Sequence, residues 1–174
     1  VYRCVNGSKK IDCLASLSTI AGNTSVSAHS LIKDKWVIFT SNEGVYEFDF
    51  QTIQITPYRK LKINNGKVIH DNYGDCWAYN NTGRIYYINV KSGEIKDFQL
   101  IPEEKMKYID YERYHVVRDD RGIVWISTYG NGLFTYDIQE DRLEHFVSEG
   151  KNAGPIGSDF LLCLMKDRTG GIWV

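Results

Sequence analysis

The sequence predicts an all-β protein made of β-propeller blades, each of them a four-stranded antiparallel sheet, and three observations support this prediction. Short runs rich in Val, Ile, Tyr, Phe and Trp alternate with Gly, Asn and Asp turns, without a helical period. The four tryptophans, at positions 36, 77, 125 and 173, recur at nearly regular intervals. Four strands in a repeat of about 40 to 50 residues are typical of a propeller blade.

The tryptophans set the frame of the repeat. The last three each end the spelling Asp-x-x-Gly-x-x-Trp, and downstream features keep step with all of the first three. A glycine follows those tryptophans at offsets of 8, 6 and 7, an Asp or Asn at offsets of 13, 12 and 12, and Tyr58, Phe98 and Phe146 at offsets of 22, 21 and 21. We therefore assign as repeat positions Trp36, Trp77, Trp125, Trp173, Asp71, Asp119, Asp167, Gly74, Gly122 and Gly170.

The third copy shows how one repeat divides into strands. Apolar and aromatic residues predict strands at 114–117, 124–128, 133–137 and 143–146, separated by turns at 119–122, 130–132 and 139–141. Extending this frame gives a tail of a preceding blade at 1–30, blades at 31–66, 67–113 and 114–161, and the start of another at 162–174. Residues 1–174 are thus predicted to be a single segment, a fragment of a larger propeller.

The recurring residues are expected to have structural roles. A large side chain is needed once per blade to fill the wedge between neighbouring sheets, and tryptophan suits that position. The glycine three positions before it suits a positive φ, and the aspartate that opens the turn can accept hydrogen bonds from the turn's amides. Repetition in every blade favours a scaffold role for these aspartates over a single catalytic site.

Composition excludes several partners for this segment. Lysines and arginines number 21 against 22 acidic residues, and no basic run is long enough to hold a nucleic acid backbone. No apolar run of about 18 residues is present, so we expect no membrane contact by the segment. The four cysteines lack C-x-x-C spacing and the four histidines lack H-x-x-x-H spacing, so neither a metal nor a cofactor is predicted.

The cysteines leave one alternative open. A disulfide between Cys4 and Cys13 is sterically conceivable in an oxidising compartment, whereas small buried apolar side chains are the interpretation that we favour.

Residues 120–137 closely resemble the two-component regulator propeller repeat. They carry its Asp, its Gly, an apolar strand centred on Trp125, a small residue with Thr128, then Gly-Leu and a Tyr-Asp ending. The resemblance covers roughly residues 30–174. It is weaker in the second copy, where Ala78 and Tyr79 replace the usual Ile-Gly, and weakest in the first.

This resemblance implies the periplasmic sensor region of a hybrid two-component system histidine kinase/response regulator, an inner-membrane protein. Such regions typically bind oligosaccharides released from glycans, and binding regulates transcription through the kinase of the full-length protein. The kinase part is not in these 174 residues, so no enzymatic activity is expected of the chain itself.

Other interpretations remain open at this point. The segment could be a structural or dimerisation scaffold without its own ligand, in which the rest of the parent propeller or another chain, as in a homodimer, covers the open blade faces. A four-blade closure is a further alternative, with residues 1–17 supplying the last two strands of the blade begun at 162–174.

Propeller enzymes are a less favoured alternative. The stretch from Asp120 to Trp125 matches part of the sialidase Asp-box, although Arg118 stands where that box has Ser. Residues 167–170 echo the docking repeat of quinoprotein dehydrogenases in one copy only.

Candidate ligand residues lie where the connections between blades are longest. The stretch from Tyr58 to Trp77 is shorter than the two later stretches, from Phe98 to Trp125 and from Phe146 to Trp173. The first long connection contains Tyr108 and Tyr111, and Tyr129 and Asn131 lie in the turn after the Trp strand. Flat aromatic rings beside polar groups suit sugars, so we predict these four as ligand-binding residues, the alternative for each being an ordinary surface residue.

Overall fold

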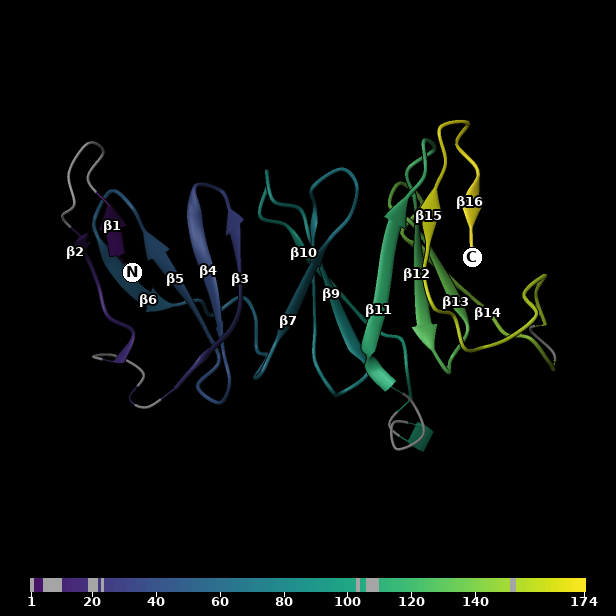
Figure 1. The fold of residues 1–174 in the computed structure, drawn as a ribbon, viewed down its shortest axis with the longest axis horizontal. Helices are drawn as coiled ribbons and strands as arrows, with labels where there is room; N and C mark the ends of the chain where they lie inside the picture. The colour runs from purple at the N-terminus through teal and green to yellow at the C-terminus, as the bar shows by residue number, and fades with distance from the viewer. Residues whose placement is uncertain are drawn as a thin grey trace. The chain divides into compact units, whose positions relative to one another are not determined.

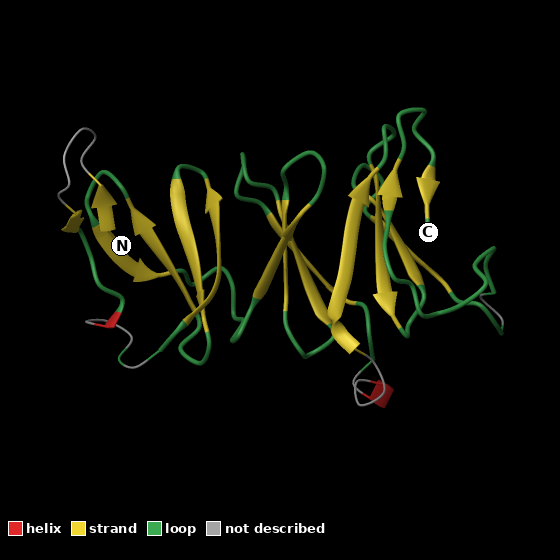
Figure 2. Ribbon diagram, viewed as in Figure 1, coloured by secondary structure: helices red, strands yellow, loops and turns green. Residues whose placement is uncertain are grey.

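The computed structural model describes residues 2–4, 11–18, 22, 24–102, 104–105, 110–150 and 153–174. Strands and loops make up nearly all of this chain, with only short helical turns (Figure 2). Within these described residues, three four-stranded antiparallel sheets and two two-stranded sheets follow one another along the sequence (Figure 1). The predicted all-β fold with four-stranded blades is confirmed. The chain divides into two compact units, 1–68 with 89–95 and 69–88 with 96–174.

Unit 1 contains the first complete blade and a two-stranded sheet. Blade 1 has the strand order β3-β4-β5-β6, and the small sheet pairs β1 with β2. The blade core consists of Ile38, Tyr46, Phe48 and Ile55, against which Leu14, Ala15, Leu17 and Trp36 pack. The strands are β1 (Tyr2–Cys4), β2 (Ile11–Cys13), β3 (Val26–Ile32), β4 (Lys35–Thr40), β5 (Val45–Asp49) and β6 (Gln54–Pro57).

Two complete blades follow, and unit 2 holds the second of them with most of the first. Blade 2 has the order β7-β8-β9-β10 and blade 3 the order β11-β12-β13-β14, and β15 pairs with β16 in a two-stranded sheet. The strands are β7 (Lys67–His70), β8 (Cys76–Tyr79), β9 (Arg84–Ile88), β10 (Ile95–Gln99), β11 (Asp110–Arg118), β12 (Ile123–Tyr129), β13 (Leu133–Asp137), β14 (Arg142–Phe146), β15 (Met165–Lys166) and β16 (Ile172–Trp173).

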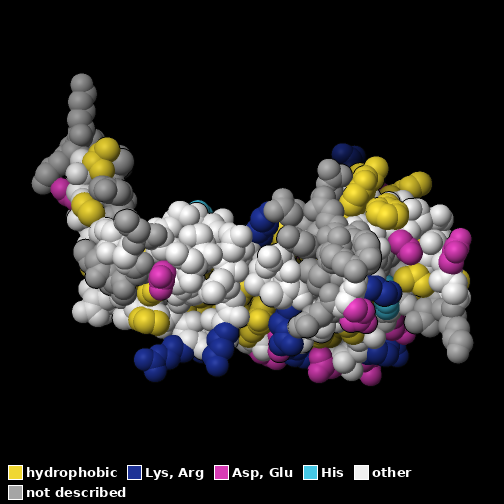
Figure 3. Space-filling model, turned by 90° about the horizontal axis from the view of Figure 1, so that it is seen from below, with side chains coloured by type: hydrophobic (Ala, Val, Ile, Leu, Met, Phe, Trp, Pro, Cys, Tyr) yellow, Lys and Arg dark blue, Asp and Glu magenta, His cyan; other side chains and the backbone are white. Residues whose placement is uncertain are grey.

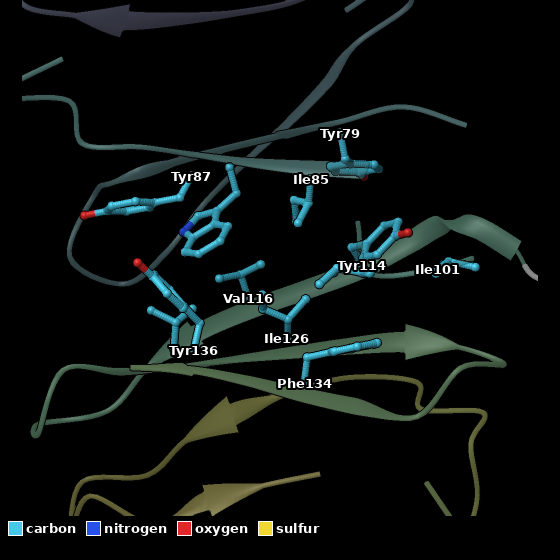
Figure 4. Packing of buried hydrophobic residues seen from close by; sticks show 12 residues of the cluster. Tyr79, Ile85, Tyr87, Ile101, Tyr114, Val116, Ile126, Phe134 and Tyr136 are labelled. Atoms are coloured by element: carbon cyan, nitrogen blue, oxygen red, sulfur yellow. The ribbon is translucent and has the colours of Figure 1, made fainter. Parts of the chain in front are cut away.

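The core of unit 2 lies between blades 2 and 3. Alternate residues of each strand point to the same sheet face, so one face of blade 2 meets the opposite face of blade 3. Figure 4 shows the labelled side chains of the two sheets pointing toward one another. Aromatic rings connect the sheets directly: the centroids of Phe98 and Tyr136 are 4.6 Å apart, and Trp77 lies 6.5 Å from Tyr136. The Trp77 side chain is fully buried in this cluster.

The turn before each Trp strand has one geometry in all three Asp-x-x-Gly-x-x-Trp copies. Oδ1 of the aspartate accepts hydrogen bonds from the amides two and four positions later. Its Oδ2 accepts from the tryptophan indole at 3.4, 3.4 and 2.7 Å. The glycines have φ values of 87°, 89° and 88° at Gly74, Gly122 and Gly170, which a side chain would strain. The spelling therefore encodes an Asx-type turn that also orients the tryptophan ring.

Trp36 does not belong to this series, which corrects the frame of the first copy. Thr40 and Thr128 make the same turn, each donating through its hydroxyl to the carbonyl four positions later. Counting back from these threonines, Val37 rather than Trp36 corresponds to Trp125. A shift of one position turns a strand side chain to the other sheet face, and Trp36 packs with Ile38. The first-copy offsets of 8, 13 and 22 each exceed those of the third copy by one for this reason.

The cysteines do not form the conceivable disulfide. The register of the β1–β2 pair places Cys4 opposite Ile11, and Cys13 is free and exposed. Cys163 is also exposed and free, while Cys76 is buried. The favoured interpretation of a small buried side chain is thus right for Cys76 and wrong for Cys13 and Cys163.

Candidate functional site

The strands of unit 2 end at two opposite edges, which we call the turn end and the connection end. The turn end carries the turns from first to second strands, at 71–75, 119–122 and 167–170. The connection end carries the turn from second to third strand of blade 3, at 129–132, and the connection from blade 3 to β15. Figure 3 views the molecule from the connection end and shows hydrophobic side chains exposed among charged ones over the part formed by β11–β16.

At the connection end, the segment before β15 is fixed to blade 3 through its main chain. The amides of Gly130 and Gly132 both donate to the carbonyl of Asp159 at 3.0 Å, and the Leu161 amide donates to the Thr128 carbonyl at 3.1 Å. Gly132 cannot be replaced without movement, because a Cβ there would lie 2.2 Å from the Phe146 carbonyl oxygen. These contacts hold the connection in one place on the blade.

This arrangement brings two aromatic rings together, which we call the aromatic platform: Tyr129 and Phe160. The two residues form an antiparallel β-bridge, and their ring centroids lie 5.2 Å apart at an interplanar angle of 76°. Tyr129 is half-buried, while 56% of Phe160 is exposed. Because the main chain on both sides of Phe160 is hydrogen-bonded to blade 3, its large exposed ring forms an apolar contact surface at a defined place on the blade.

The structure places the four predicted ligand residues differently from one another. Tyr129 is part of the platform, and Asp110 pairs with Tyr129 in the β11–β12 ladder, so the next residue, Tyr111, lies at the same edge. Tyr108 and the side chain of Tyr111 lie outside the described residues. Asn131 is buried, and its amide nitrogen donates to the Leu100 carbonyl at 3.3 Å, so we leave it out of the candidate site.

Phe160 was missed by the reasoning from sequence. It lies in the second long connection, the one from Phe146 to Trp173, which lacks the tyrosines found in the first. The sequence did contain a signal for Phe160, because an aromatic residue stands there near the end of a long connection, just before the first strand of a blade.

The turn end carries another exposed aromatic ring, Tyr73, but polar groups already surround it. Its hydroxyl donates to Asp120 at 3.2 Å, and Asp120 also pairs with Lys166. The Arg118 guanidinium lies 5.0 Å from the ring centroid and the Lys166 ammonium 5.9 Å. The Lys166 ammonium lowers the pKa of Asp120, and Asp120 raises the pKa of Lys166. The cluster ties three successive turns together, which favours a structural role.

Other kinds of site are not supported in the part of the chain that the structure describes. Its residues include no group of three or more His, Cys, Asp or Glu side chains placed to hold a metal ion. None of the helices in this described part has the length and apolar character needed to cross a bilayer.

Comparisons with known proteins found similar solved structures but no match in sequence. No family model matches the chain, and no curated protein matches it in sequence. Among solved structures, one described as the extracellular domain of a hybrid two component system from B. thetaiotaomicron aligns over 90% of this chain and 20% of its own length, with 15% identity and a TM-score of 0.52. A second such domain from that organism aligns over 99% and 29%, with 14% identity and a TM-score of 0.39. The WD40 repeats of RRP9 align over 71% and 38%, with 7% identity and a TM-score of 0.43.

The chain therefore spans only about a fifth of the length of the first of these domains. At this level of identity the likeness establishes the fold of the chain: a propeller-type series of four-stranded blades, in agreement with the resemblance of residues 120–137 to the two-component regulator propeller repeat.

Proposed function

We propose that this chain is a ligand-sensing segment of the extracytoplasmic part of a hybrid two-component sensor, and that it binds an oligosaccharide at the aromatic platform. The observation that carries the proposal is the exposed Phe160 ring, fixed against Tyr129 where the longest described connection meets blade 3. The proposal assigns no catalytic step to this chain. In the full-length protein, the bound sugar would act on transcription through the kinase.

The chemistry of the platform suits a sugar. The C–H faces of a pyranose ring pack on aromatic rings, and its hydroxyls need hydrogen-bonding groups close by. Such groups flank Phe160: the Ser158 hydroxyl lies two positions before it, and the Asp159 carboxylate accepts a hydrogen bond from the Ser148 amide at 2.6 Å. A ligand on Phe160 would therefore contact the same segment that is hydrogen-bonded to the turn of blade 3.

That segment also supplies a path for the signal. Residues 153–164 connect blade 3 to β15, and the amides of Gly130 and Gly132 anchor the connection to the blade. A ligand that binds only the anchored arrangement stabilises it by mass action, and so biases the contact between blade 3 and the strands that follow.

The test is a thermal-shift screen of the chain against a panel of neutral and acidic oligosaccharides. We expect one class of glycan to raise the melting temperature, because a ligand bound only by the folded state stabilises that state. Phe160→Ala should abolish the shift. Tyr73→Ala is the matched control, because Tyr73 is 54% exposed on the same unit but at the turn end, and it should keep the shift.

Two outcomes would overturn the proposal. The first is that no glycan shifts the melting temperature of the wild-type chain, which would favour the scaffold interpretation. The second is a glycan-induced shift that Phe160→Ala retains and Tyr73→Ala loses, which would move the site to the turn end.

A further inference from the structure

Two Asn-Gly pairs in the described part of the chain have opposite surroundings. They are Asn65–Gly66, in the connection from blade 1 to blade 2, and Asn131–Gly132, in the turn after β12. Asparagine before glycine loses its side-chain amide readily, because glycine has no Cβ to hinder its own nitrogen when that nitrogen attacks the preceding side chain. Whether the attack occurs in a folded protein depends on what already holds the two reacting groups.

At Asn131 both reacting groups are held. The side chain is buried, and its amide nitrogen, which would leave as ammonia, donates to the Leu100 carbonyl at 3.3 Å. The Gly132 amide, which would be the nucleophile, donates to the Asp159 carbonyl at 3.0 Å. Both hydrogen bonds would have to break before the Asn131 side chain could react, so the fold protects this pair.

At Asn65 neither reacting group is held by the residues that the structure describes. The Asn65 side chain is exposed and makes no hydrogen bond with them, and the Gly66 amide has no acceptor among them. The Asn65 amide donates to the Thr40 carbonyl at 2.8 Å. The Gly66 carbonyl accepts from the Ser27 hydroxyl at 2.9 Å. These contacts fix the connection on blade 1 but leave the side chain and the nucleophilic nitrogen available.

The packing around Gly66 also explains why the residue there is glycine. Gly66 is buried, and a Cβ at this position would lie 2.7 Å from Cδ1 of Phe39. The close approach that requires glycine therefore also leaves its nitrogen unhindered. Burial of Gly66 does not prevent the reaction, because the nitrogen attacks its own neighbour in the chain and only the exposed Asn65 has to meet water.

We propose that Asn65 is a site of spontaneous deamidation, which converts it to aspartate and isoaspartate. The Gly66 nitrogen bonds to Cγ of Asn65, the bond from Cγ to Nδ2 breaks, and Nδ2 leaves as ammonia with the proton that the Gly66 nitrogen gives up. One water molecule then opens the resulting succinimide ring. Opening at Cγ gives aspartate, and opening at the main-chain carbonyl carbon gives isoaspartate. This inference is independent of the proposed ligand.

Isoaspartate should disturb the contact between this connection and blade 1. In isoaspartate the main chain runs through Cγ, so the chain gains one carbon atom directly before a glycine that packs on the fully buried Phe39. Aspartate adds a charge at an exposed position but no length. We therefore expect the isoaspartate form to melt at a lower temperature than the aspartate form, because close-packed interiors tolerate displacement poorly.

The test is peptide mapping by mass spectrometry of the folded wild-type chain, incubated in mildly alkaline buffer and sampled over time. The peptide with Asn65 should gain the mass of an amide-to-acid conversion roughly tenfold faster than the peptide with Asn131, where two hydrogen bonds must break first. In urea both peptides should react at similar rates, since only the local sequence then matters. Labelling with an isoaspartyl methyltransferase identifies the isoaspartate product.

Two variants separate the effects of the products on stability. Asn65→Gln keeps an amide, but its longer side chain forms the cyclic imide far more slowly, so its melting temperature should not change during incubation. Freshly purified Asn65→Asp carries the new charge without the longer main chain. The incubated wild type should melt below both variants. Circular dichroism establishes that each variant is folded before its result is used.

Four results would overturn the proposal. The first is an Asn65 that keeps its amide in the folded chain. The second is equal rates at Asn65 and Asn131 in the folded chain, which would mean that the hydrogen bonds give no protection. The third is a difference that persists in urea, which would assign it to local sequence rather than to the fold. The fourth is an incubated wild type that contains isoaspartate but melts as Asn65→Asp does.

Discussion

Trp77 and Trp125 occupy the same position of the repeat, yet their surroundings differ. Each follows an Asp-x-x-Gly-x-x-Trp turn, and each indole donates to the first aspartate of that turn at 3.4 Å. Trp77 is fully buried because blade 3 covers it, whereas Trp125 is half-buried over an open hollow. Trp173, in the third copy of the spelling, is 62% exposed. The repeat thus encodes the turn and the ring's orientation, while the next blade decides how much the ring stabilises the fold.

The largest effect should come from Trp77→Ala. Truncating a fully buried tryptophan removes its apolar contacts and leaves a cavity, at a cost of about 3 to 5 kcal/mol in the free energy of unfolding. Urea denaturation followed by tyrosine fluorescence or circular dichroism would measure it. A loss below about 1 kcal/mol would contradict the assignment of Trp77 as the main filler between blades 2 and 3.

Trp125→Ala should cost less, about 1 to 2 kcal/mol, because only one side of the ring is packed. The measurement is urea denaturation followed by circular dichroism. An equal cost for Trp77→Ala and Trp125→Ala would remove the distinction between the two positions.

Asp119→Asn tests the turn beneath Trp125. Burial acts to raise the pKa of the Asp119 carboxyl, but hydrogen bonds from Arg121, Ile123 and Trp125 outweigh it and hold the pKa below its ordinary value of 3.8. A pKa lowered by folding stabilises the protein above 3.8 and loses that contribution as the pH falls through the folded-state pKa. We expect Asp119→Asn to cost about 1 kcal/mol at pH 7 and to weaken the acid dependence below about pH 4. If the free energy of unfolding of Asp119→Asn falls with decreasing pH as steeply as that of the wild type, the lowered pKa of Asp119 does not contribute to the acid dependence.

The smallest effect on stability is expected at the exposed copy. Hydrogen bonds from the Trp173 indole, from Thr169 and from the Gly171 amide lower the pKa of Asp167 to about 2. Trp173→Phe removes the first of these donors and should raise that pKa, as followed by carboxyl chemical shifts in an NMR titration. Stability should change little, because the Trp173 ring is exposed. A pKa that stays at about 2 would show that the indole contributes nothing to the turn.

The sequence was sufficient to predict the repeat and its turns, but not the register of every copy. The turns around Asp71, Asp119 and Asp167 are local, so their spelling was sufficient to predict the strands on either side. The spacing of the tryptophans placed Trp36 one position out of register, because Trp36 stands next to Val37, which is the residue of blade 1 that corresponds to Trp125. Aromatic residues are common in strands, so a tryptophan one position away from the repeat position still appeared to fit the pattern.

The candidate site was only partly predictable for a similar reason. Tyr129 could be singled out from its place after the Trp strand, but its partner Phe160 lies far along the chain, beyond the end of blade 3, and only the β-bridge brings them together. Asn131 looked equally suitable, yet its side-chain amide nitrogen already donates a hydrogen bond to the Leu100 carbonyl of the preceding connection. Whether a turn residue is exposed depends on which other segment of the chain packs over it.

By itself the sequence determined the all-β class, the length of the repeat and the conformation of its turns, because these depend on side chains close to one another along the chain. Tertiary structure alone decided which face of β4 holds Trp36, which of three equivalent tryptophans is buried, and which aromatic rings meet at the connection end. Those outcomes depend on contacts between strands that are far apart in the chain, and burial of apolar surface is set by what packs against it rather than by the residue that is buried.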